Sequence, residues 1–151
     1  MKFLTPLLAA LTASLLLTSC GNKGGTPKSH AEVGQAIADL RISMEAELAK
    51  VGDVASAEAF AASTTNRVAR MKELLKIAQE LPAPTSKEKE EVNALIDAAE
   101  DKVGPTVMAR LMSMSQNPTQ KEIKLILDKS LGNEEMKHAR KALEAVYRGE
   151  G

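Results

Sequence analysis

The stretch that decides the fold is residues 53–82, which read DVASAEAFAASTTNRVARMKELLKIAQELP. Asp53 is a residue type that caps the start of a helix, and Pro82 lacks the amide hydrogen that a longer helix would need. We predict a rod of about 28 residues between them, or about 42 Å at 1.5 Å per residue. Small and apolar side chains recur there in steps of three and four, which places them on one helical face: Val54, Ala57, Ala61, Thr64, Val68, Met71, Leu75 and Ala78.

The preceding segment predicts a second helix that folds back on this rod. Ser29 and Glu32 have the spacing of a capping box, in which each side chain bonds an amide of the first turn. Gly52 suits the left-handed position that ends a helix. Because only Gly52 and Asp53 would separate the two helices, we expect an antiparallel hairpin. Its first helix presents an apolar face at Val33, Ile37, Leu40, Met44, Leu48 and Val51.

A third helix is expected after Pro82. Thr85 and Glu88 form a second capping-box pattern, and apolar residues follow at helical spacing. Gly104 and Pro105 interrupt this pattern, because a proline removes a hydrogen bond and clashes with the preceding turn. The apolar phase resumes after them, so we predict a kinked helix, with two separate helices as the alternative.

Two short helices are expected at the C-terminus. Thr119 and Glu122 match a third capping box, Gly132 would close that helix, and Asn133 would cap the last one. No run of alternating β-branched residues appears after residue 28. The predicted fold is therefore all-α: the antiparallel hairpin packed with a kinked third helix and two short helices, forming a single helical domain over residues 29–151.

The first twenty residues have the features of a secretory signal. Lys2 carries a positive charge, an apolar run extends over residues 3–17, and the small residues Thr18 and Ser19 precede Cys20. This order of charge, apolar centre and small residues is typical of a cleaved signal. The run is shorter than the roughly 20 apolar residues that a membrane-spanning helix needs.

Residues 17–20, Leu-Thr-Ser-Cys, resemble the lipobox of bacterial lipoprotein precursors. The resemblance implies that residues 1–19 are removed, that Cys20 becomes lipidated, and that lipid on Cys20 attaches the protein to a membrane. Residues 20–28 then form a flexible, glycine-rich tether. The residue after the cysteine is Gly21. An aspartate at this position would suggest retention in the inner membrane, so the glycine favours the outer membrane. The implied location is the cell membrane or the outer membrane, facing the periplasm or the cell surface.

Composition excludes several classes of function. The 151 residues hold 20 basic and 20 acidic side chains, so a basic surface for DNA or RNA is not expected. One cysteine excludes an intrachain disulfide and every zinc site built on cysteines. With no Trp, one Tyr and two Phe, a platform that stacks bases or sugars is not expected either.

The candidate catalytic groups do not form a complete set. Glu135 and His138 make an E-x-x-H pair, but a di-iron bundle needs two such units and two further glutamates. His30 falls in the tether region and has no glutamate three residues before it. We interpret Glu135 and His138 as part of a solvated charged face. A solvated charged face is also the interpretation for the carboxylates that alternate with lysines at helical spacing: Glu88, Glu90, Glu91, Asp97, Glu100 and Asp101. We predict no enzymatic activity and no cofactor.

Three methionines lie within seven residues: Met108, Met112 and Met114. Thioether sulfurs are soft ligands that hold Cu(I), which makes a copper site conceivable in an extracytoplasmic protein. Methionine also fills irregular gaps in cores, and Met108 and Met112 continue the apolar stripe of the third helix. Core packing is the favoured interpretation of this cluster.

Residues 48–92, with Asp53-Val-Ala-Ser-Ala-Glu-Ala-Phe leading into a long amphipathic helix, resemble small helical bacterial lipoproteins of unknown role. The resemblance carries no functional residues. We predict a lipid-anchored, non-enzymatic envelope protein that acts by interaction or scaffolding, with small-ligand or copper binding at Met108–Met114 as the alternative. The expected partner is a protein or a second copy of the chain. Self-association is favoured by a wide apolar stripe on the second helix, which could exceed what one hairpin covers: Leu74, Leu75, Ile77, Ala78 and Leu81.

Overall fold

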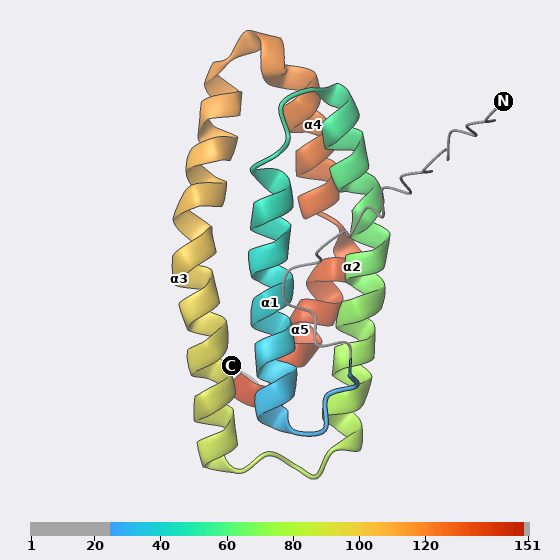
Figure 1. The fold of residues 1–151 in the computed structure, drawn as a ribbon, viewed down its shortest axis with the longest axis vertical. Coiled ribbons are helices and arrows are strands. Elements are labelled where there is room, and N and C mark those ends of the chain that lie inside the picture. The colour runs from blue at the N-terminus through green and yellow to red at the C-terminus, as the bar shows by residue number, and fades with distance from the viewer. Residues whose placement is uncertain (1–24, 150–151) are drawn as a thin grey trace, which may run out of the picture.

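The computed structural model describes residues 25–149 (Figure 1). Over this range the chain is all-α, as predicted, and contains no strand. The predicted signal peptide (1–19), Cys20 and the first part of the tether lie outside the described residues. The elements are α1 (His30–Leu48), α2 (Val54–Glu80), α3 (Ser86–Gln116), the 3-10 helix η1 (Pro118–Gln120), α4 (Lys121–Leu131) and α5 (Glu134–Arg148).

These elements form four upright rods (Figure 1). Helices α1 and α3 run in one direction and α2 runs in the other, while α4 and α5 follow one another downward and make the fourth rod. We call α4 and α5 together the C-terminal arm. Helix α1 packs along α3 and α2, and the C-terminal arm packs on the same two helices. The connection between α1 and α2 covers residues 49–53, which is longer than the two residues predicted.

Helices α1 and α3 approach each other closely at Gly34. A methyl group added at Gly34 would lie 3.1 Å from Val92 Cγ2 and 3.2 Å from Val92 Cα. Both residues are buried. The absence of a side chain at position 34 therefore sets the spacing of these two backbones.

Helix α3 continues through Pro105 over 31 residues. The alternative of two separate helices is therefore wrong. Gly104 helps to explain this continuity, because part of the clash that keeps a residue before proline out of the helical region involves its Cβ. Glycine has no Cβ, so the helical backbone is tolerated there.

Three predicted helix starts are confirmed. The Asp53 side chain accepts a hydrogen bond from the Ser56 amide at 2.7 Å. Thr85 and Glu88 form the full capping box, with the Thr85 amide donating to Glu88 Oε2 at 2.8 Å. Asn133 caps α5 by accepting from the Met136 amide. These bonds satisfy amides that the first helical turn leaves without partners.

Two other predictions about helix ends are wrong. Thr119 does not cap a helix, because Asn117 accepts the Thr119 amide and Pro118 opens the 3-10 turn, so that α4 starts at Lys121 without a side-chain cap. Gly52 does not adopt a left-handed conformation, since Gly149 is the glycine with positive φ in the described chain. Helix α1 already ends at Leu48.

The start of α1 also differs in detail from the prediction. Ser29 accepts from the Glu32 amide, but Glu32 Oε2 accepts from the Lys28 amide at 2.5 Å rather than from Ser29. Pro27 is buried. Residues 27 and 28, predicted as tether, thus belong to the folded part.

The buried side chains form two clusters, one at each end of the bundle. In the lower core, which lies at the His30 end, α5 covers the wide apolar stripe of α2. The upper core gathers residues from all the rods beside the α1–α2 connection. The lower core contains Val33, Ile37, Met71, Leu74, Ile77, Ala78, Val92, Ile96, Ala139, Leu143 and Tyr147; the upper core contains Leu48, Val51, Ala57, Phe60, Met114, Ile123 and Leu127.

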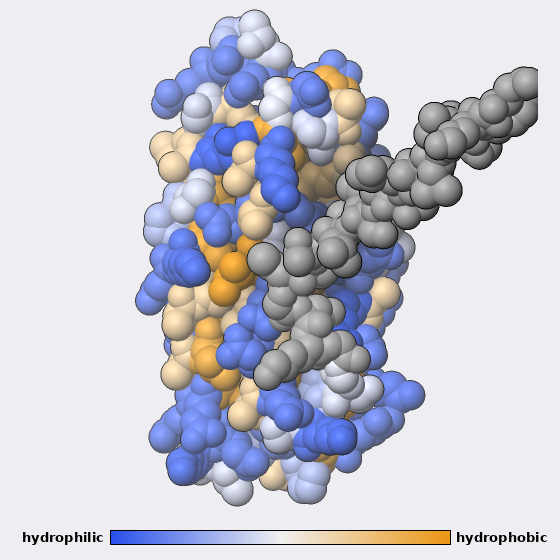
Figure 2. All heavy atoms as spheres, viewed as in Figure 1, coloured by the Kyte–Doolittle hydropathy of each residue, from blue (hydrophilic) through white to orange (hydrophobic). Residues whose placement is uncertain are grey.

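The outer surface is mainly polar. Figure 2 shows hydrophilic residues over most of one face, with apolar residues along the seam between α1 and α3. Among the described helices, none has a stretch long and apolar enough to cross a membrane.

Candidate functional site: a central cavity

A partly open cavity of about 600 Å³ lies between the rods of the bundle, where it borders both cores. All four rods contribute to its walls. This volume is within the usual range of small-molecule sites, roughly 300–1,000 Å³. Nine of the lining residues are apolar: Ile37, Leu40, Met44, Met71, Val103, Val107, Met108, Leu131 and Met136.

One wall of the cavity carries a buried polar group. The Arg67 side chain is 7% exposed, and its Nη2 donates to Glu47 Oε2 at 2.5 Å. Its guanidinium lies 4.1 Å from the centre of the Phe60 ring and donates to the Thr64 hydroxyl at 3.3 Å. The Thr64 and Ser130 hydroxyls are 2.5 Å apart. Burial of these groups is tolerated because each one has a hydrogen-bond partner inside the protein.

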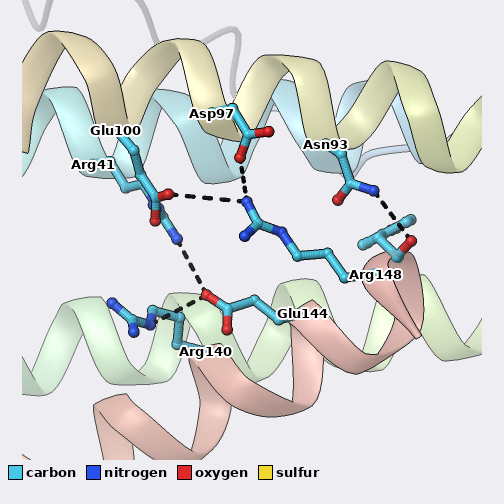
Figure 3. Close-up of polar contacts among 8 residues, drawn as sticks. Arg41, Asn93, Asp97, Glu100, Arg140, Glu144 and Arg148 are labelled. Atoms are coloured by element: carbon cyan, nitrogen blue, oxygen red, sulfur yellow. Dashed lines mark hydrogen bonds and ion pairs between the residues drawn. The ribbon is translucent and has the colours of Figure 1, made fainter. Parts of the chain in front are cut away.

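Ion pairs join three helices beside the cavity (Figure 3). Arg41 of α1 donates to Glu100 of α3 and lies 3.6 Å from Glu144 of α5. Glu144 also pairs with Arg140 at 3.3 Å. Partial burial alone would raise the pKa of Glu100, but the hydrogen bond from Arg41 and the nearby arginine charges lower that pKa below its usual value.

The same network continues to the end of α5 (Figure 3). Arg148 donates to Asp97 and lies 3.9 Å from Glu100. Asn93 donates to the Tyr147 carbonyl at 3.2 Å. Polar contacts of Asn93, Asp97 and Glu100 thus connect α3 to the last turn of α5.

The charges that line the cavity are mostly positive. Four lining residues are basic, namely Arg41, Arg67, Lys137 and Arg140, and one, Glu100, is acidic. The carboxylates that pair with Arg67, Lys137 and Arg140 belong to residues outside the lining. The lining therefore offers hydrocarbon contact, two hydroxyls and four cationic side chains, each of which is paired with a carboxylate.

A second buried polar contact closes the lower end of the bundle. His30 is the first residue of α1 and is buried, so its placement in the tether region was wrong. Its Nδ1 lies 3.0 Å from the Tyr147 hydroxyl and its Nε2 lies 2.7 Å from the Pro82 carbonyl oxygen. Burial, with a smaller effect of the Glu88 charge, raises the pKa of Tyr147 to about 12. We call His30, Tyr147 and Pro82 the terminal clamp.

The structure separates the three methionines of the sequence cluster. Met114 is 3% exposed and lies in the upper core. Met108 and Met112 are 61% and 57% exposed, so the prediction that they pack in the core is wrong. The three sulfurs do not lie on one face, and of the three residues Met108 borders the cavity.

The E-x-x-H pair lies on the surface. Glu135 and His138 are both exposed, and Glu135 pairs with Lys72 at 2.6 Å. This agrees with the predicted charged face. Within residues 25–149 no group of three or more His, Cys, Asp or Glu is placed to hold a metal ion.

Sequence reasoning missed the cavity, although two positions signalled it. Arg41 lies four residues after Ile37, and Arg67 lies three residues after Thr64, so each arginine falls on the inner face of its helix. A basic residue within an apolar stripe is unusual, because a buried charge needs a partner. That signal identifies α1 and α2 as walls of a polar interior site.

Compared with protein families, with curated proteins and with solved structures, the chain has no match. Assignment of a role to the lining residues therefore rests on their geometry. That geometry combines apolar walls, satisfied buried polar groups and cationic side chains, which are the elements of a binding site.

Proposed function

We propose that the chain is a non-enzymatic binding protein of the bacterial cell envelope, attached through lipid on Cys20, that holds a small and largely hydrocarbon molecule in its central cavity. The cavity of about 600 Å³ between the two cores is the observation that carries the proposal. Apolar surface that leaves water on binding contributes roughly 25 cal/mol per Å², so nine apolar lining residues favour a hydrocarbon ligand.

The surroundings favour a preformed site. The cores at both ends hold the rods apart at fixed distances, and the buried polar groups Arg67, Thr64 and Ser130 bond to groups of the protein itself. A ligand then enters without first breaking these bonds. Binding to a preorganised cavity avoids the cost of ordering loops and side chains.

The anchor is tested separately from the cavity. The Leu-Thr-Ser-Cys sequence at residues 17–20 supports lipidation of Cys20. Intact mass of the protein from its native membranes should show a chain that begins at Cys20 and carries acyl groups. An unmodified N-terminus would contradict the anchor and would leave the proposal about the cavity unchanged.

Ligand binding can be followed with a tryptophan, because the chain has none. Met136→Trp places a reporter in the lining, and Met112→Trp places a matched one on the exposed surface. The full chain is held in phosphatidylcholine nanodiscs and titrated with a brominated long-chain alcohol, which quenches tryptophan on contact. We expect saturable quenching at position 136 and weak, non-saturating quenching at position 112.

A cavity-filling variant completes this test. Val107→Phe adds a ring to a half-buried lining residue, whereas Val146→Phe adds the same ring at a half-buried residue outside the lining. We expect the first substitution to weaken quenching at position 136 at least tenfold and the second to leave it unchanged. Equal quenching at positions 136 and 112, or no effect of Val107→Phe, would refute ligand binding in the cavity.

A second candidate function, docking of a protein partner, is favoured by exposed apolar side chains. Met108 and Met112 lie one turn apart on α3, and both are more than half exposed. Large exposed apolar groups that cluster mark interaction sites. Photo-crosslinking from position 112 in native membranes should then give one defined adduct, and an absence of adducts would contradict this function.

A further inference from the structure

The charges around the cavity define the class of ligand, and this inference rests on the proposed binding of a hydrocarbon chain. We propose that the ligand is an amphiphile with a single hydrocarbon chain and one acidic head group. The chain occupies the cavity, and Lys137 and Arg140 hold the head group at its rim.

The sign of the lining charge favours an acid over an alcohol or an amine. Four of the five charged lining residues are basic. The one acidic residue, Glu100, is already bonded to Arg41. A cationic head group would meet like charges, and an uncharged one would gain little from them.

Lys137 and Arg140 are suited to receive the head group. They lie three residues apart, which places them on the same face of α5. Both side chains are more than half exposed, and each pairs with a glutamate of its own helix. Exposed pairs of this kind contribute little to stability, so a ligand carboxylate or phosphate can share the two cations.

The interior arginine is a poorer site for the acid. Arg67 is buried, and Glu47 lies 2.5 Å from its guanidinium. An acidic group placed there would lie close to the Glu47 carboxylate, and repulsion between like charges is strong where water is scarce. The head group therefore belongs at the rim, with the chain directed inward past Arg67.

The test compares head groups on chains of equal length. The full chain with Met136→Trp, in phosphatidylcholine nanodiscs, is titrated with brominated laurate, the matching alcohol and the matching alkylammonium. A fourth titration uses a brominated lysophosphatidylglycerol. We expect both acids to bind at least tenfold more tightly than the alcohol at low salt, and the ratio to shrink in 1 M salt, where charges are screened. The tighter of the two acids identifies the source as a free fatty acid or a membrane lipid.

Charge-removal variants locate the head group. Lys137→Gln combined with Arg140→Gln should abolish the preference for acids, measured as the ratio of acid affinity to alcohol affinity. Lys121→Gln combined with Lys141→Gln removes the same charge from exposed positions of the C-terminal arm outside the lining, and should preserve the preference.

The possible results separate the two proposals. Equal binding of acid and alcohol, or a preference that survives the Lys137 and Arg140 changes, overturns the acidic head group while hydrocarbon binding stands. Absence of saturable quenching by every amphiphile overturns both proposals.

Discussion

Replacing Tyr147 with phenylalanine tests the terminal clamp most directly. The Pro82 carbonyl only accepts hydrogen bonds, so His30 Nε2 must carry the proton that it shares with this oxygen. In the neutral ring Nδ1 is then an acceptor, and the Tyr147 hydroxyl donates to it. Phenylalanine removes this donor and leaves a buried acceptor without a partner, which costs about 1–3 kcal/mol. We therefore expect the free energy of unfolding to fall by that amount at pH 8.

The same hydroxyl makes stability depend on pH in the alkaline range. The unfolded chain releases the tyrosine proton near pH 10, but the folded protein holds it until about pH 12. Between these values the folded state binds more protons, so the free energy of unfolding decreases as pH rises. At about 1.4 kcal/mol per pH unit, the loss amounts to about 2–3 kcal/mol by pH 12. Tyr147→Phe lacks this loss, so the two stability curves should converge.

The assay is urea unfolding followed by far-ultraviolet circular dichroism at pH 8, 10, 11 and 12. Lysine titration affects both proteins equally and cancels in the difference. Because Tyr147 is the one tyrosine of the chain, phenolate absorbance of the folded protein reports its pKa without interference. A difference in stability that stays constant from pH 8 to pH 12, or a phenolate midpoint near 10, would refute the reasoning.

Three further substitutions, two of them with a matched control, have defined outcomes. Gly34→Ala should destabilise the protein by about 0–2 kcal/mol in thermal unfolding, because overpacking against α3 outweighs the gain in helix propensity. Gly52→Ala is the control and should not destabilise the protein, because its added carbon meets nothing within 4 Å. Thr85→Ala should lower the free energy of unfolding, measured by urea unfolding, by about 1 kcal/mol because a helix cap is lost. Thr119→Ala should change this free energy much less, because Thr119 caps no helix. Cys20→Ser should abolish acyl mass and move the protein out of the membrane fraction.

Helix starts were predictable where the signal is contained in one turn. Asp53, Thr85 and Asn133 each bond an amide three residues ahead, and nothing else competes for that amide. At Thr119 the predicted cap is absent because the chain already begins a 3-10 turn at Pro118, in which Asn117 accepts a hydrogen bond from the Thr119 amide. Local spacing therefore identifies a cap only when the preceding residues do not offer another.

The exposed methionines were mispredicted because the inward face of α3 follows other positions. After Val103 the side chains that pack inward come in steps of four, four and three, at Val107, Leu111 and Met114. Met108 and Met112 each lie one position away from this series and are left exposed, whereas Met114 is buried in the upper core.

The cavity lies beyond what periodicity reveals. Its walls come from four rods, and the distance between the rods depends on features such as Gly34. An apolar stripe predicts which face is turned inward, but not whether opposite faces touch or leave space. The arginines on those faces were visible in the sequence, and their mutual arrangement around the space was not.

The terminal clamp also governs how the bundle bears tension. The beginning of α1 and the end of α5 lie at one end of the bundle, and His30 bonds both to Tyr147 and to the Pro82 carbonyl (Figure 1). A pull on the N-terminus is therefore passed at once to α5 and to the connection between α2 and α3. The load is then shared by three segments at the near end of the bundle. Mechanical failure of the fold would start by peeling the first turn of α1.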